Sequence, residues 1–298
     1  MSKKPIGIAF KPREPYTNRI KRILEDYPDG SQILREILQN SDDAKSTEQI
    51  FILDYNNYPS TRLFEPLLSN CKTKNLKLER YQGPALLSKN DTIFDERDFS
   101  SLLKLADSEK RDQFDKIGVM GVGFNSIYHI TDSPSFITDK KYVILDPHEY
   151  YFEGGRVYDF VEDDLQNFYN DQILPFSKPF GNIKFNKPFN GTIFRYPLRT
   201  EQDSIDSNIS KISYSPKKIL EMFENFYQKE SVNCLLFLKY IETISFYEFK
   251  KGAVKPDLLY KIELKNADEV RSQRRLVVEQ IIKQMKIFQD HKQRVDTR

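Results

Sequence analysis

The feature that most constrains this chain is a glycine run that leads directly into a predicted amphipathic helix. Residues 118–130 read GVMGVGFNSIYHI. Backbone N–H groups at a helix N-terminus lack partners within the helix and carry partial positive charge, so a glycine-rich entrance to a helix is a natural seat for phosphate. The order G-x-x-G-x-G matches neither the Rossmann fingerprint nor a Walker A loop. On pattern alone, a tight turn before a helix explains it equally well.

A second stretch, residues 36–44, reads EILQNSDDA. At about 100° per residue, Glu36, Asn40 and Asp43 fall on one helical face, within roughly 60° of each other. Asparagine is unfavourable in the middle of a helix, so this polar stripe needs a reason beyond solvation. A carboxylate–amide face together with a phosphate seat predicts a site for a magnesium nucleotide. A solvated helix glutamate is the plain alternative for Glu36.

Composition excludes several classes of protein. The 298 residues are 39% hydrophobic and 30% charged, as in globular proteins with a sizeable core. Lysine plus arginine (46) nearly balance aspartate plus glutamate (44), so we expect no nucleic-acid partner. Two distant cysteines suit a reducing compartment, and three dispersed histidines argue against zinc. No secretory signal and no run of about 20 apolar residues is visible, so we expect a cytoplasmic protein without a membrane span.

Hydrophobic spacing predicts several helices. They cover residues 18–27, 31–44, 96–105, 216–230 and the tail from residue 267. We expect Thr17 to cap the first helix and His129, in the helix after the glycines, to be structural. The polar stretch 106–117 is typical of a mobile loop. Residues 56–74 give no clear pattern.

Runs rich in β-branched and aromatic residues predict the strands. They cover residues 49–55, 85–88, 136–138, 142–146, 191–196, 234–238 and 243–249. This pattern indicates an α/β protein with helices segregated from a mixed sheet. We assign residues 1–250 to one domain and 251–298 to a C-terminal extension. The long, charged, amphipathic helix of that extension would dock on the domain or form a dimer.

The motifs, in their order along the chain, resemble those of the sacsin-type branch of the GHKL (Bergerat-fold) ATPases. Relatives in that superfamily include gyrase, the ninety-kilodalton heat-shock chaperones, sensor histidine kinases and MutL. The matching segments lie within residues 10–199 and include ILREILQNSDDA, GPALLSKNDTIF, KIGVMGVGFNSIYHITDSPSF and GTIFRYPLR. The resemblance implies a two-layer α/β (α+β) sandwich. A mixed, mostly antiparallel sheet would carry helices on one face, with ATP between the helices under a lid.

The resemblance also implies roles for single residues. Glu36 would be the catalytic residue that polarises the attacking water, and the side-chain oxygen of Asn40 would hold Mg²⁺. Asp43 and Ala44 complete the same motif.

The family's adenine-reading aspartate corresponds to Asn90-Asp91, where we favour Asp91. A plain turn between a strand and a helix is its alternative. Thr192 would support the adenine through water, although strand propensity alone also explains a threonine there. The residues expected at the phosphates are Gly118, Gly121, Val122, Gly123 and Phe124.

By resemblance, the chain is expected to be an ATP-binding, slowly ATP-hydrolysing, chaperone-like module of protein quality control. ATP and Mg²⁺ would be its cofactors, and protein clients or co-chaperones its partners. A module that binds nucleotide without cleaving it is the alternative, because related ATPases take a γ-phosphate cation from a following domain and only about 100 residues follow Arg199. A signalling kinase is disfavoured because no histidine precedes Glu36. The near-neutral charge disfavours a DNA-processing role.

Overall fold

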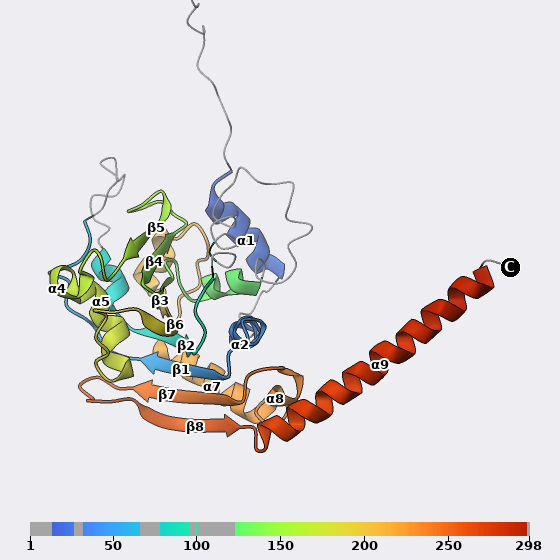
Figure 1. The fold of residues 1–298 in the computed structure, drawn as a ribbon. Helices are drawn as coiled ribbons and strands as arrows, with labels where there is room; N and C mark the ends of the chain where they lie inside the picture. The colour runs from blue at the N-terminus through green and yellow to red at the C-terminus, as the bar shows by residue number, and fades with distance from the viewer. Residues whose placement is uncertain (1–13, 27–31, 66–77, 96–98, 100–122, 297–298) are drawn as a thin grey trace, which may run out of the picture.

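The computed structural model describes residues 14–26, 32–65, 78–95, 99 and 123–296. Within these residues the fold is built on one sheet of eight strands, in the order β5-β4-β3-β6-β2-β1-β7-β8 (Figure 1). The strands are β1 (Glu48–Asp54), β2 (Ala85–Asn90), β3 (Ser135–Asp139), β4 (Lys141–Asp146), β5 (Gly154–Asp159), β6 (Phe189–Pro197), β7 (Thr243–Phe249) and β8 (Asp257–Glu263). The β1–β7 pair is parallel and the other neighbouring pairs are antiparallel.

Helices connect these strands and cover the sheet. The α-helices are α1 (Tyr16–Asp26), α2 (Ile33–Asp43), α4 (Leu165–Phe168), α5 (Asn170–Ser177), α6 (Glu201–Asp206), α7 (Pro216–Lys229), α8 (Cys234–Phe237) and α9 (Ala267–Asp296). The 3-10 helices are η1 (Leu78–Gln82), η3 (Gly123–His129) and η4 (Lys178–Phe180).

One face of the sheet carries α1, α2, η3 and α7. The apolar residues of these helices recur at intervals of three or four, so each helix presents an apolar stripe to the sheet. Ile20 on α1, Leu34 and Leu38 on α2, and Phe223 on α7 are all buried in one core cluster. In the strands, alternate residues such as Phe51 in β1 contribute to the same cluster, as the two-residue period of a strand requires. This layer holds the candidate site.

The opposite face of the sheet is covered by the short helices α4 and α5 and by loops. Leu165 from α4 and both Ile173 and Phe176 from α5 are buried in a second core cluster. Ile52 of β1 and Leu87 of β2 belong to this second cluster, whereas the residues that precede them, Phe51 and Leu86, belong to the first. The expected two-layer α/β sandwich with a mixed, mostly antiparallel sheet is confirmed. Short helices and loops add cover to its second face.

The C-terminal part of the chain differs from the expected division at residue 250. Strand β8 lies beyond that boundary, yet it pairs with β7 and forms an edge of the sheet. The sheet therefore continues into the segment assigned to an extension, because β7 would otherwise leave its hydrogen-bonding groups unpaired along that edge. Helix α9 begins beside α8 and then projects away from the domain (Figure 1).

Most predicted elements lie within a few residues of the observed ones, and two expectations were wrong. Residues 234–238, predicted as a buried strand, form the one-turn helix α8, on which Leu236 and Phe237 are exposed. Thr17 lies inside α1 rather than at its N-cap. Strands β5 and β8 were not predicted. The loop 106–117 and nearly all of the helix predicted at 96–105 lie outside the described residues.

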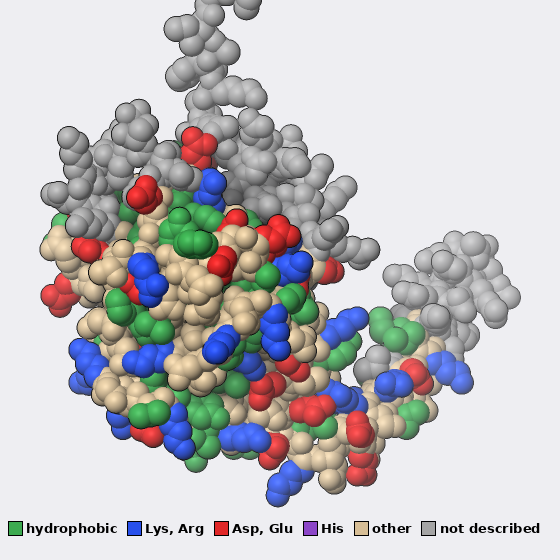
Figure 2. Space-filling model, turned by 60° about the vertical axis from the view of Figure 1, so that its left-hand side comes forward, with side chains coloured by type: hydrophobic (Ala, Val, Ile, Leu, Met, Phe, Trp, Pro, Cys, Tyr) green, Lys and Arg blue, Asp and Glu red, His purple; other side chains and the backbone are tan. Residues whose placement is uncertain are grey.

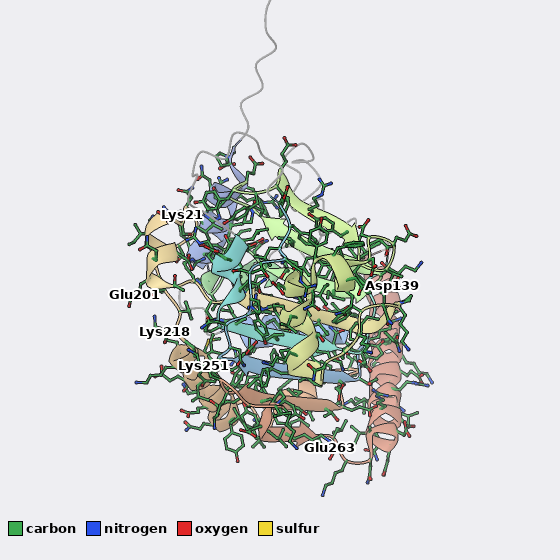
Figure 3. The ribbon with its side chains drawn as sticks, turned by 90° about the vertical axis from the view of Figure 1, so that its left-hand side faces the viewer. Lys21, Asp139, Glu201, Lys218, Lys251 and Glu263 are labelled. Atoms are coloured by element: carbon green, nitrogen blue, oxygen red, sulfur yellow. The ribbon has the colours of Figure 1, made fainter. Side chains whose placement is uncertain are left out.

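Charged side chains surround this core. Figure 3 shows Lys21, Glu201 and Lys218 at one side of the fold and Asp139 at the other, all on its periphery. On the face seen in Figure 2, blue and red side chains are interspersed among the described residues. This distribution agrees with the near balance of charge in the sequence.

Candidate functional site

Glu36 and Gly123, which are far apart in the sequence, are in direct contact. A Cβ atom built on Gly123 would lie 1.9 Å from Oε2 of Glu36, so only glycine leaves room for this carboxylate. Glu36 lies on α2 and Gly123 begins η3, and both elements pack on the same face of the sheet. Burial raises the pKa of the Glu36 carboxyl above its ordinary value. The structure thus brings together the two motifs that the sequence predicted to meet.

The other residues of the predicted α2 motif take different environments. Asn40, one turn after Glu36, is half-buried, and so is Ala44, the C-cap residue of α2. Asp43 is exposed and lines a groove of about 540 Å³ beside α7 and α8. Among the described residues, neither the Glu36 carboxylate nor the Asn40 amide takes part in a hydrogen bond within the protein.

Asp42 is a buried residue to which the sequence analysis gave no role. Its carboxylate accepts hydrogen bonds from the backbone N–H groups of Lys239, Tyr240 and Ile241, at 2.9, 2.6 and 3.1 Å. This carboxylate therefore fastens the segment before β7 to α2. Its position on α2 was a usable signal, because it continues the buried line of Leu34 and Leu38 at four-residue spacing.

Asn90 and Thr192 are cross-strand neighbours on the helix-covered face of the sheet. They are register partners between β2 and β6, and both are buried. The Asn90 side chain donates from Nδ2 to the hydroxyl of Ser41 on α2, at 3.0 Å. It also accepts at Oδ1 from the backbone N–H of Thr92, at 3.1 Å. Because Ser41 directly follows Asn40, Asn90 lies close to the α2 face that carries Glu36 and Asn40.

The Thr192 hydroxyl belongs to a short hydrogen-bond chain. It donates to the carbonyl oxygen of Thr92 at 2.6 Å, and it lies 2.9 Å from the hydroxyl of Thr138 on β3. A hydroxyl has one hydrogen, so Thr138 must be the donor in the second contact. Thr138 in turn accepts from the N–H of Phe94 at 3.1 Å. The remaining lone pair of Thr192 can therefore only accept a hydrogen bond.

Asp91, the residue favoured for base recognition, is bonded to the turn before β1. Its carboxylate accepts from the hydroxyl of Ser46, from the N–H and hydroxyl of Thr47 at 2.9 and 2.5 Å, and from the N–H of Glu48 at 3.2 Å. Burial opposes ionisation of this carboxyl, but these hydrogen bonds outweigh it and hold its pKa below the ordinary value. In this arrangement Asp91 joins the end of β2 to the start of β1.

The end of the glycine run lies above β6. The ring of Phe124 packs against that of Phe194, with centroids 6.0 Å apart, and Phe194 follows Thr192 by two residues on the same face. Gly123 and Phe124 are therefore close to the polar end of β6. Gly118, Gly121 and Val122 lie outside the described residues, and their expected roles stay predictions.

Arg199 holds the C-terminal end of η3, a role for which the sequence carries no signal. It is 1% exposed and donates to the carbonyl oxygens of Tyr128 at 2.6 Å, of His129 at 2.7 Å and of Thr131 at 3.1 Å. Its ion pair with Asp132 closes the network at 2.7 Å. Last-turn carbonyls of a helix otherwise lack partners, so this cation fixes the segment that begins at Gly123. His129 is buried, as expected of a structural residue.

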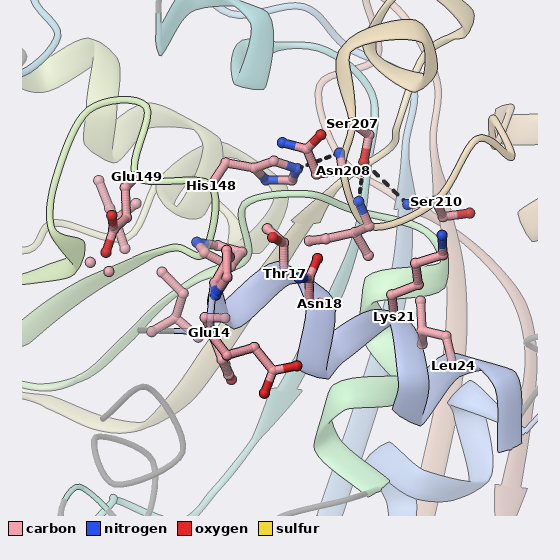
Figure 4. Close-up of a pocket in the computed structure, with 18 of the residues that line it drawn as sticks. Glu14, Thr17, Asn18, Lys21, Leu24, His148, Glu149, Ser207, Asn208 and Ser210 are labelled. Carbon is pink, nitrogen blue, oxygen red and sulfur yellow. Dashed lines mark hydrogen bonds between the residues drawn. The ribbon is translucent and has the colours of Figure 1, made fainter. Parts of the chain in front are cut away.

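A separate cavity of about 1390 Å³ lies between α1, the β4–β5 hairpin and the loop 207–212 (Figure 4). His148 is part of its wall and accepts a hydrogen bond at Nε2 from the N–H of Asn208, at 3.0 Å. Burial lowers the pKa of His148 to about 4. Of the predicted site residues that the structure describes, none lines this cavity.

The described residues contain no group of three or more histidine, cysteine or acidic side chains arranged for a metal ion. None of the helices in that part of the chain is long and apolar enough to cross a membrane.

These observations define an α/β domain with a polar site between its helices and one end of its sheet. The profile described as Sacsin domain matches residues 13–261, and the chain belongs to this family. Sacsin of Homo sapiens is 36% identical to it over 240 residues. That match covers 78% of this chain and 5% of the length of Sacsin. A crystal structure of the N-terminal domain of a DNA repair protein gives a TM-score of 0.42 at 12% identity, covering 85% of this chain and 57% of that one.

Proposed function

We propose that the chain binds ATP with Mg²⁺ between α2, η3 and the polar end of the sheet. The observation that carries this proposal is the contact between Glu36 and Gly123, which joins the carboxylate–amide face of α2 to the end of the glycine run. A nucleotide site needs both parts within the length of a triphosphate. Membership of the Sacsin domain family supports the same assignment.

In this proposal the base lies against Asn90 and Thr192. Oδ1 of Asn90 accepts one hydrogen bond from the Thr92 N–H and has a second lone pair left. The Thr192 hydroxyl has already donated its hydrogen, so toward a ligand it can only accept. Two acceptors suit the exocyclic amino group of adenine, which offers two hydrogens. We place base recognition on Asn90 rather than Asp91, because the Asp91 carboxylate already accepts four hydrogen bonds from the turn before β1.

The phosphates would lie along the glycine run, with the N–H groups of residues 121–124 directed at them. The Asn40 oxygen would be the protein ligand of Mg²⁺. This ion usually takes one or two protein oxygens and completes its shell with phosphates and water, so a single amide oxygen fits it. Glu36 would hold a water molecule, and its raised pKa brings the carboxyl closer to the range of a general base.

A calorimetric titration of the purified chain with Mg·ATP and Mg·ADP tests the proposal. We expect saturable binding that Asn90→Leu weakens at least tenfold and that Asp91→Asn leaves nearly unchanged. The wild-type chain should bind ATP more tightly with Mg²⁺ than with EDTA, and Asn40→Ala should remove this difference in affinity. A folded wild-type chain that shows neither heat nor a rise in melting temperature with Mg·ATP would refute the proposal.

Hydrolysis is a separate step and has its own test. Glu36→Gln should retain Mg·ATP binding and lose any release of phosphate that the wild-type chain catalyses. If the wild-type chain binds nucleotide but releases no phosphate, the function is that of a non-hydrolysing nucleotide-binding module.

We also propose the chaperone-like role in protein quality control that the family resemblance implies. Its test is light scattering from a heat-unfolded reporter protein, with and without Mg·ATP. The role is supported if the wild-type chain suppresses scattering to an extent that depends on Mg·ATP and if Asn40→Ala removes that dependence. Equal scattering with and without the chain would refute it.

A further inference from the structure

One polar row crosses four neighbouring strands at the end of the sheet below α2. Gln49 of β1 pairs with Asn90 of β2, Asn90 with Thr192 of β6, and Thr192 with Thr138 of β3. All four side chains are buried, with exposures of 1%, 6%, 0% and 0%. The next positions on this face of β1, β6 and β3 are phenylalanines in the apolar core. The row is therefore a built polar layer, in which every side chain needs a partner.

The hydrogen bonds of this row determine which way the Asn90 amide faces. The N–H of Thr92 can only donate, so the atom of Asn90 beside it is Oδ1. Nδ2 then donates to the hydroxyl oxygen of Ser41, and the Ser41 hydrogen passes to Oε1 of Gln49, at 2.6 Å. Gln49 is itself oriented, because its Nε2 donates to the carbonyl oxygen of Ile50 at 3.1 Å.

We propose that Gln49 is a positioning residue that acts through Ser41 and, together with the N–H of Thr92, keeps the oxygen of Asn90, rather than its nitrogen, toward a bound base. This inference rests on the proposed function, in which Asn90 meets the amino group of adenine. A carboxylate at position 90 would present oxygen in either orientation and would need no such control. An amide has one accepting and one donating end, so its orientation decides whether an amino group is attracted or repelled.

Gln49→Leu separates this role from a structural one. Without the Gln49 acceptor, the Ser41 hydrogen is free to turn toward Asn90, so the N–H of Thr92 is the one fixed hydrogen bond left to orient the amide. We expect Mg·ATP to bind at least about tenfold more weakly, which corresponds to about 1.4 kcal/mol. Gln82→Leu is the matched control, since Gln82 is also a buried amide but bonds to the carbonyl oxygen of Asp171 on the other face of the sheet.

The double variant Gln49→Leu/Asn90→Asp provides the decisive comparison. A carboxylate at position 90 accepts from Ser41 with one oxygen and keeps the other for the base, so affinity should return to within about threefold of that of Asn90→Asp alone. Structural damage by leucine at position 49 would not be repaired by a change at position 90. The inference also predicts a nuclear Overhauser effect between the Asn90 side-chain amide protons and the β-protons of Ser41 in the free chain, lost in Gln49→Leu.

Each outcome has a distinct meaning. Wild-type affinity in Gln49→Leu, or a double variant as weak as Gln49→Leu while Asn90→Asp binds well, overturns the positioning role and leaves the nucleotide site intact. Failure of the folded wild-type chain to bind Mg·ATP overturns the proposed function and this inference with it. Weak binding by Gln49→Leu, normal binding by Gln82→Leu and recovery in the double variant support it.

Discussion

Replacing Gly123 by alanine would place a methyl group where the Glu36 carboxylate now lies. The new Cβ would be 1.9 Å from Oε2, and ordinary contacts begin at 3.4 Å, so this oxygen must retreat by about 1.5 Å. The side chain can move because its far end is flexible, at a cost of about 0.5–1.5 kcal/mol if it leaves a preferred rotamer.

The free energy of unfolding of Gly123→Ala should therefore fall by no more than about 1.5 kcal/mol, whereas the position of the Glu36 carboxylate should change greatly. A displacement of about 1 Å in a reacting group can lower a rate about a hundredfold, so any phosphate release should fall by that order. The pKa of the Glu36 carboxyl should also fall toward its ordinary value of 4.5, because the carboxylate leaves its buried seat.

Chemical denaturation and a carbon-detected NMR titration of Glu36 measure these two effects, and the second requires no nucleotide. Gly83→Ala is the control, because a Cβ there would be 3.4 Å from Oδ1 of Asn57, an ordinary contact. An unchanged pKa of Glu36 in Gly123→Ala, or a loss of more than about 3 kcal/mol in stability, would refute the packing of α2 against η3 described above.

Four further predictions concern stability. Glu36→Gln should raise the free energy of unfolding at pH 7, since the raised pKa means that folding disfavours the ionised carboxyl; the gain should vanish below pH 4.5, where both states are protonated. The free energy of unfolding of the protein should fall by about 3 kcal/mol as the pH falls from 6.5 to about 4, because His148 takes up a proton in the unfolded chain before it does so in the folded one. Denaturation curves of His148→Gln should lack this dependence on pH. Arg199→Met should cost about 3–5 kcal/mol in urea denaturation, as it leaves Asp132 buried without its ion pair. Asp42→Ala should cost about 1–3 kcal/mol and speed hydrogen exchange of the three amide groups that it binds.

The strands and long helices could be predicted because their apolar residues follow a clear period. Residues 234–238 were predicted wrongly because CLLFL is a continuous apolar run without a period. A short helix and a buried strand read alike in such a run. The exposure of Leu236 and Phe237 depends on where the chain turns after α7, which is a tertiary property.

The site was predictable in part. The motif at residues 36–44 and the end of the glycine run meet as expected, at Glu36 and Gly123. The choice between Asn90 and Asp91 depends on which of them faces the helices, and both faces of β2 are buried. Alternation in β2 therefore carries no polar signal that distinguishes its two faces. Arg199 was beyond sequence reasoning, because most of its partners are backbone carbonyls, which leave no mark in the sequence.

Helix α2 is connected mechanically to the base of α9. Asp42 holds the segment 239–241, and Arg271 and Arg274 of α9 donate to the carbonyl oxygens of Tyr240 and Leu238. Helix α9 has 30 residues, which at about 1.5 Å per residue gives a rod about 45 Å long. A tilt of about 5° at its base moves the far end by about 4 Å over that length. Through these bonds, a rotation of about 5° beside the candidate nucleotide site would become a displacement of several ångströms at the far end of α9.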